Sequence, residues 1–81
     1  MPYTDKIEST KQKLVEAKQT LKDLQEKKAT ITDAAELKAV NKQINALQEE
    51  IGKLKKDISL YASLNRDATR DYHEMILGEL E

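Results

Sequence analysis

Apolar residues recur along most of the chain at alternating steps of three and four, which is the spacing of one helix face. The repeat is strictest in the second half, where the a and d positions of four heptads are filled by Leu37, Val40, Ile44, Leu47, Ile51, Leu54, Ile58 and Tyr61. The first part carries it less richly, in Tyr3, Ile7, Thr10, Leu14, Ala17, Leu21 and Leu24. A 3.5-residue repeat of this length favours a coiled-coil seam over two independent amphipathic helices.

The segment between the two repeats predicts a turn. Two lysines end the first repeat, and three β-branched residues follow them. Asp33 and Glu36 then have the spacing of a capping-box variant that starts a second helix. At the other end, Thr4 is expected to cap the first helix, because a threonine oxygen accepts a bond from a first-turn amide. We therefore expect one helical domain over residues 1–81, with helices over 5–29 and 34–62 and a turn over 30–33.

The charges beside the seam predict that it closes within one chain. In an antiparallel pair the g positions face each other, and folding the chain about residues 31–32 would pair Lys6 with Asp57, Lys13 with Glu50, Thr20 with Gln43 and Lys27 with Glu36. Exposed ion pairs contribute only about 0.2–1 kcal/mol each, but they specify orientation and register. The prediction is an all-α antiparallel coiled-coil hairpin in which Tyr3 stacks on Tyr61.

The C-terminal segment, about 64–79, is expected to be helical in one of two arrangements. The second helix could continue, or Ser63 or Asn65 could cap a third helix that folds back on the hairpin. An apolar stripe remains in both cases, and the first helix has no residues left to cover it: Leu60, Leu64, Ala68, Tyr72, Met75, Ile76 and Leu80. Such a stripe marks either a partner interface or the closure of the protein's own bundle or dimer.

We assign the partner-binding role to this stripe and to the two arginines beside it. Tyrosine and methionine are enriched in interface cores, and arginine can make bidentate contacts at the rim. The expected partner-binding residues are Leu64, Arg66, Arg70, Tyr72, Met75, Ile76 and Leu80.

Composition narrows the fold and the location. Hydrophobic residues make up 38 % of the chain and charged residues 36 %. The only aromatic residues are three tyrosines, and the chain has two Gly and one Pro. Strands and tight turns need more β-branched, aromatic, Gly and Pro residues. The absence of Cys excludes disulfides and thiol chemistry. Neither a secretory signal nor a membrane-spanning stretch is present, so we expect a cytoplasmic protein that does not enter a membrane.

The chain offers little for catalysis or for cofactors. His73 is the one group that titrates near neutral pH, and we expect it on a solvated helix surface. The three serines lack a glycine-rich elbow, so no catalytic triad is indicated. Metal binding by His73 with neighbouring acids lacks the second histidine that would make it specific, and no nucleotide-binding glycine motif is present. We expect a non-enzyme without cofactor or metal.

A lysine edge offers an alternative binding function. The net charge is −1, so no global field attracts nucleic acid. Lys11, Lys18 and Lys55 nevertheless share the e edge of the predicted hairpin, where no row of acids balances them. They could meet an acidic partner or phosphates, although no aromatic residue is interleaved for base stacking.

The expected function is non-catalytic protein binding by an adaptor, an assembly or scaffolding subunit, or a small inhibitor. A core of this size stabilises a chain by only about 3–5 kcal/mol, so we expect a homo-oligomer, a dimer that doubles the hairpin into a helical bundle. The alternatives are a monomeric three-helix bundle and a nucleic-acid-associated accessory protein that uses the lysine edge. Heptads occur in many unrelated proteins and indicate no family.

Overall fold

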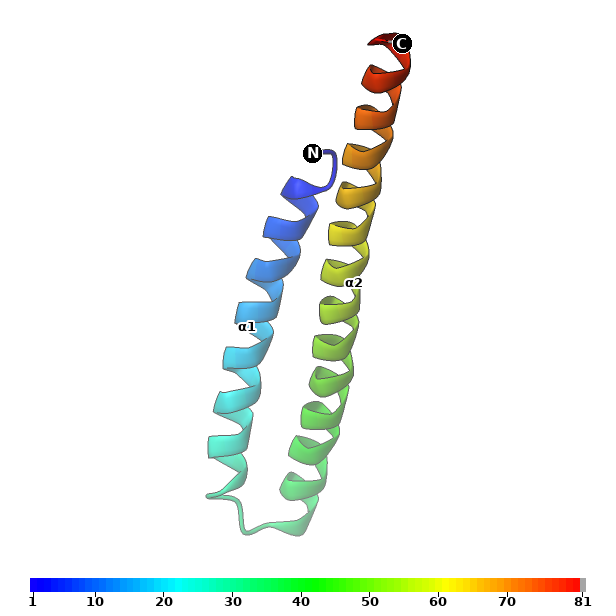
Figure 1. Ribbon diagram of the computed structural model, residues 1–81. Helices are drawn as coiled ribbons and strands as arrows, with labels where there is room; N and C mark the ends of the chain where they lie inside the picture. The colour runs from blue at the N-terminus through cyan, green and yellow to red at the C-terminus, as the bar shows by residue number, and fades with distance from the viewer. Residues whose placement is uncertain (81) are drawn as a thin grey trace.

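The computed structural model describes the backbone of residues 1–80 and the side chains of residues 1–70. It consists of two helices, α1 (Thr4–Lys28) and the longer α2 (Ala34–Leu80). The two helices run antiparallel and pack along the length of α1 (Figure 1), and residues 1–80 contain no strand. The predicted all-α antiparallel hairpin is confirmed.

The heptad repeat correctly identifies the core. Every predicted a and d residue of the two helices is buried or half-buried. The centre of the seam is a cluster of Ala17, Ile51 and Leu54, against which Leu14, Leu21 and Leu47 pack. The small Ala17 lets α1 approach the larger side chains of α2 closely. Among the described side chains none is less than 2 % exposed, because a single seam covers each side chain from one direction only.

The open end of the hairpin has the predicted aromatic layer. The rings of Tyr3 and Tyr61 are stacked, with centroids 5.7 Å apart and planes at 15°. The Tyr3 backbone N–H also donates to Asn65 Oδ1 over 2.9 Å. Tyr3 therefore lies between positions 61 and 65 of α2, which confirms the register expected from the heptads.

The predicted ion pairs beside the seam do not form close contacts. Among the side chains of residues 1–70, no lysine of the pairs Lys6–Asp57, Lys13–Glu50 and Lys27–Glu36 lies within 4.0 Å of its carboxylate. Lys6 instead places its Nζ 5.8 and 5.7 Å from the ring centroids of Tyr3 and Tyr61. An ammonium that stays in water keeps its hydration and its side-chain entropy, so an exposed lysine gains little by contacting a carboxylate.

The start of α2 agrees with prediction, whereas the start of α1 does not. Thr4 is the first helical residue and not the cap; Tyr3 occupies the N-cap position and makes no side-chain capping bond. The prediction for Thr4 is wrong because the stacked Tyr3 fixes the helix boundary one residue earlier. Asp33 does cap α2, accepting from the Glu36 backbone N–H at 3.0 Å. Between the helices, Thr30 N–H and Ile31 N–H bond back to Lys27 and Lys28 carbonyls.

The C-terminal segment continues α2 and does not form a third helix. Ser63 and Asn65 both lie inside α2, and the Asn65 side chain bonds α1 rather than capping a new helix. The result is a rod of 72 × 15 × 12 Å with a radius of gyration of 20.1 Å, against about 12 Å for a compact chain of this length. The N-terminus lies part of the way along α2 (Figure 1).

Candidate functional site

The most distinctive feature of the molecule is the part of α2 that extends past the N-terminus. Thr69 Oγ1 lies 3.0 Å from Met1 Sδ and 3.0 Å from the Asn65 carbonyl oxygen. Thr69 therefore contacts the first residue of the N-terminal segment. We call residues 70–80 the α2 overhang; Figure 1 shows that no part of α1 runs beside it.

The predicted partner-binding residues lie on both sides of this boundary. Leu64 is half-buried, and Arg66 and Arg70 are exposed. The other four occupy positions in the α2 overhang, and their side chains lie outside the described residues: Tyr72, Met75, Ile76 and Leu80. All seven predicted partner-binding residues therefore lie on one helix, α2.

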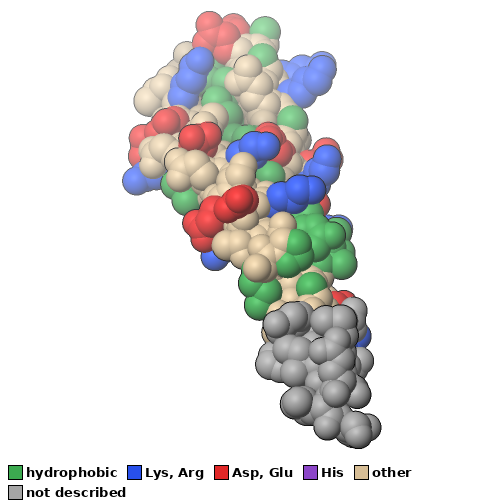
Figure 2. Space-filling model, turned by 90° about the horizontal axis from the view of Figure 1, so that it is seen from above, with side chains coloured by type: hydrophobic (Ala, Val, Ile, Leu, Met, Phe, Trp, Pro, Cys, Tyr) green, Lys and Arg blue, Asp and Glu red, His purple; other side chains and the backbone are tan. Residues whose placement is uncertain are grey.

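An apolar surface lies next to the α2 overhang. Met1, which contacts Thr69, is 71 % exposed, and Figure 2 shows hydrophobic side chains gathered next to the residues drawn in grey. A hollow of about 390 Å³ is lined by Met1, Pro2, Ala68 and Thr69. Sequence reasoning missed Met1, Pro2 and Thr69. The pairing of Tyr3 with Tyr61 was the available signal, because it brings the first two residues beside this stretch of α2.

The lysine edge is exposed as predicted. Lys11 and Lys18 on α1 and Lys55 on α2 are all solvent-exposed. Within residues 1–70, none of the three is paired with a carboxylate within 4.0 Å. On the face shown in Figure 2, however, basic and acidic side chains are interspersed. An anion would therefore meet scattered positive charges there rather than a continuous basic field.

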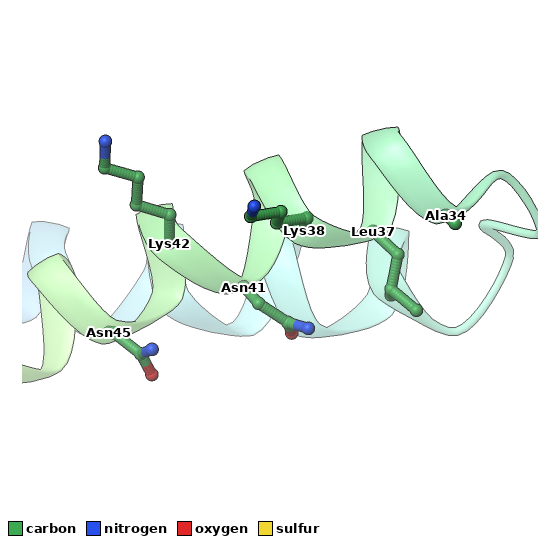
Figure 3. Close-up of a pocket in the computed structure, with 6 residues that line it drawn as sticks. All are labelled: Ala34, Leu37, Lys38, Asn41, Lys42 and Asn45. Carbon is green, nitrogen blue, oxygen red and sulfur yellow. The ribbon is translucent and has the colours of Figure 1, made fainter.

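A hollow along the first turns of α2 is lined by lysine and asparagine side chains, without His, Cys, Asp or Glu. It has a volume of about 530 Å³ and is lined by six residues of α2 alone: Ala34, Leu37, Lys38, Asn41, Lys42 and Asn45. Figure 3 shows Lys42 pointing to the opposite side of the helix from the two asparagines, so the polar groups do not converge. Among the described side chains, no three His, Cys, Asp or Glu residues are grouped to hold a metal ion.

The helices also lack the properties of a membrane span. Within the described residues, neither α1 nor α2 has a stretch that is long and apolar enough to cross a membrane. The polar face and the charged flanks of the heptads interrupt every apolar run.

Comparison with known proteins does not place the chain in a family. No family model matches it, and no curated protein or solved structure shows significant similarity to it.

Proposed function

We propose that the protein is a non-catalytic protein-interaction module that self-associates and uses the C-terminal part of α2 to bind a partner. Adaptors, assembly or scaffolding subunits and small inhibitors are the functional classes that fit. The observation that carries the proposal is the unequal length of the helices, 25 residues in α1 and 47 in α2. A helix that extends beyond its intrachain partner offers an amphipathic face for another helix.

Self-association is supported by the amount of surface that the hairpin leaves exposed. Its accessible surface is 6415 Å², whereas a compact monomer of 9.2 kDa exposes about 4,900 Å². The excess of about 1,500 Å² for one chain is larger than the roughly 800 Å² that each partner buries in a standard protein–protein interface.

The binding role of the α2 overhang is tested by replacing Tyr72 and Ile76 together with serine. We expect the variant to lose partner capture, because both positions belong to the apolar stripe, while its far-UV circular dichroism stays helical. Val15→Ser is the matched control, since Val15 is 62 % exposed and lies on α1, away from the overhang. Capture would be measured by pull-down from the source cells with quantitative mass spectrometry. Unchanged capture, or loss of the helical signal, would refute the assignment.

The lysine edge favours a second candidate function, contact with nucleic acid. Lys11, Lys18 and Lys55 are exposed, and phosphate binding by such residues weakens steeply with added salt. A gel-shift assay at about 50 mM salt, where the electrostatic contribution is strong, would compare the native chain with a variant carrying glutamine at all three positions. If neither protein shifts nucleic acid at micromolar concentration, this candidate is excluded.

A further inference from the structure

The seam between α1 and α2 does not end where α1 ends. The heptad that α1 covers at Tyr61 and Asn65 continues in the same phase along α2, through Ala68, Tyr72 and Met75. Because α2 is one uninterrupted helix to Leu80, these positions continue the face that packs on α1. The α2 overhang therefore extends the α1–α2 seam, but no helix of this chain lies against it. We call the absent second helix of this extended seam the missing strand.

The junction between the covered and uncovered parts of the seam is open. The N-terminal segment reaches Thr69 through Met1 and leaves the hollow lined by Met1, Pro2, Ala68 and Thr69. Beyond it the overhang spans about 16 Å at 1.5 Å per residue. A helix that continues the missing strand would begin at this hollow and run antiparallel to α2, as α1 does.

We propose that this missing strand is the α2 overhang of a second copy of the same chain. The inference rests on the proposed function, because it names the partner of the same binding element. The uncovered face of each overhang is as long as one overhang. Two copies whose overhangs overlap in antiparallel orientation therefore cover each other's uncovered faces. Such an arrangement is a closed two-fold contact in which the same residues are used on both sides.

The register follows from the packing already present in the hairpin. There Tyr3, a d position, stacks on Tyr61, and its backbone N–H donates to the side chain of Asn65, the next a position along α2. The same rule in the dimer places Tyr72 level with Met75 of the second copy, and Ala68 level with Glu79 of the second copy. The end of each overhang then reaches the hollow beside Met1 and Pro2 of the other chain.

The salt dependence of association distinguishes this dimer from docking of the overhang on the lysine edge. Residues 70–81 carry one Arg against four acids, a balance of −3, so two overhangs repel each other and apolar contact must hold them together. Added salt screens that repulsion, and the dimer should therefore tighten as salt rises. Docking of the acidic overhang on the edge formed by Lys11, Lys18 and Lys55 would instead weaken with salt.

Engineered disulfides test the register, because the chain has no cysteine of its own. Ala68→Cys and Glu79→Cys variants are oxidised separately and as an equal mixture. We expect a cross-link only in the mixture, between position 68 of one chain and position 79 of the other. Identical positions would lie about 16 Å apart, beyond the reach of a disulfide. Val15→Cys gives the background of random collision.

Efficient cross-linking of each variant with itself would mean a parallel dimer, and cross-linking no better than that of the Val15→Cys control would mean no such contact. Either result overturns the proposal.

Particle length and mass give an independent test. Two rods of 72 Å that overlap by about twelve residues make a particle about 125 Å long, whereas two hairpins packed side by side stay near the length of one. Small-angle scattering and sedimentation at low and high salt measure both quantities. Replacing Tyr72 and Ile76 with serine should raise the dimer Kd by about tenfold or more, because it removes the apolar contact.

The two proposals fail in different ways. A chain that stays monomeric at high concentration, but loses partner capture when Tyr72 and Ile76 are replaced, overturns the second-copy inference and supports the proposed function. A chain in which these replacements change neither mass nor capture overturns both.

Discussion

At the scale of single residues, Asn65 and Tyr3 determine where the two helices stop pairing. Asn65 is polar at a seam position that usually holds an apolar residue. Its Oδ1 accepts the Tyr3 N–H at 2.9 Å, one of the first backbone donors of α1, which have no partner within the helix. Tyr3 also stacks on Tyr61, one turn before Asn65 in α2. A polar side chain and an aromatic pair therefore close the end of the hairpin.

The contribution of seam burial can be measured with one substitution at two places. Val40 is 5 % exposed and Val15 is 62 % exposed. We expect Val40→Ala to lower the free energy of unfolding by about 1.5 kcal/mol, from about 0.8 kcal/mol per buried methylene. Val15→Ala should leave it unchanged or slightly higher, because alanine is the better helix former. Chemical denaturation of both variants is the measurement; equal losses would contradict the seam assignment.

Gly52 offers a stabilising substitution inside α2. A Cβ built at this position meets nothing within 4 Å, so an added methyl group has room. Gly52→Ala should raise the free energy of unfolding by about 0.5–1 kcal/mol, since alanine loses less conformational freedom in a helix than glycine does. Urea titration would show a higher midpoint at an unchanged slope. A lower midpoint would mean that a partner helix approaches this backbone closely.

At the scale of elements, the two helix starts differ in what fixes them. The start of α1 depends on contacts with the far end of α2, through Tyr3 and Asn65. The start of α2 is local: Asp33 Oδ2 accepts from the Glu36 N–H at 3.0 Å, and the Asp33 carbonyl accepts from the Leu37 N–H at 2.9 Å. The turn can therefore form before the rest of the hairpin packs.

The Asp33 cap predicts that stability falls when the capping side chain is removed and is largely kept when another capping residue replaces it. Asp33→Ala should lower the free energy of unfolding by about 1 kcal/mol, because an N-cap side chain satisfies an otherwise unpaired amide. Asp33→Asn should restore most of it, since asparagine caps about as well as aspartate. Thermal unfolding of both variants, followed by circular dichroism, is the measurement. Equal destabilisation by the two would show that charge, and not the cap bond, is what matters.

At the scale of the whole molecule, the hairpin could be predicted from the sequence but the extent of α2 could not. The seam followed from the regular placement of residues such as Leu47 and Ile51 and from opposite charges that only an antiparallel fold brings together. Ser63 and Asn65, by contrast, are as suitable for capping a third helix as for continuing the second. A tertiary bond between Asn65 and Tyr3 occupies the side chain instead. The cap predicted at Thr4 failed for the same reason, because distant contacts fixed that boundary.

The division into a hairpin and an overhang predicts how stability depends on concentration. Removing residues 71–81 should leave the hairpin folded, because the core cluster and the contacts of Tyr3 and Met1 with α2 all lie before residue 71. In dilute solution the truncated and full chains should melt at nearly the same temperature. In concentrated solution only the full chain should gain, since association through the overhang stabilises the folded state by mass action.

A hundredfold rise in concentration should therefore raise the Tm of the full chain by about 5 °C or more and leave the truncated chain unchanged. Circular dichroism melts over that range are the measurement. If the Tm of the truncated chain also rises, the hairpins themselves associate side by side. Association then covers surface along α1 and α2 instead of at the overhang. If neither chain gains, the rod is a monomer over this range, and the apolar face of the overhang must be covered by a different protein.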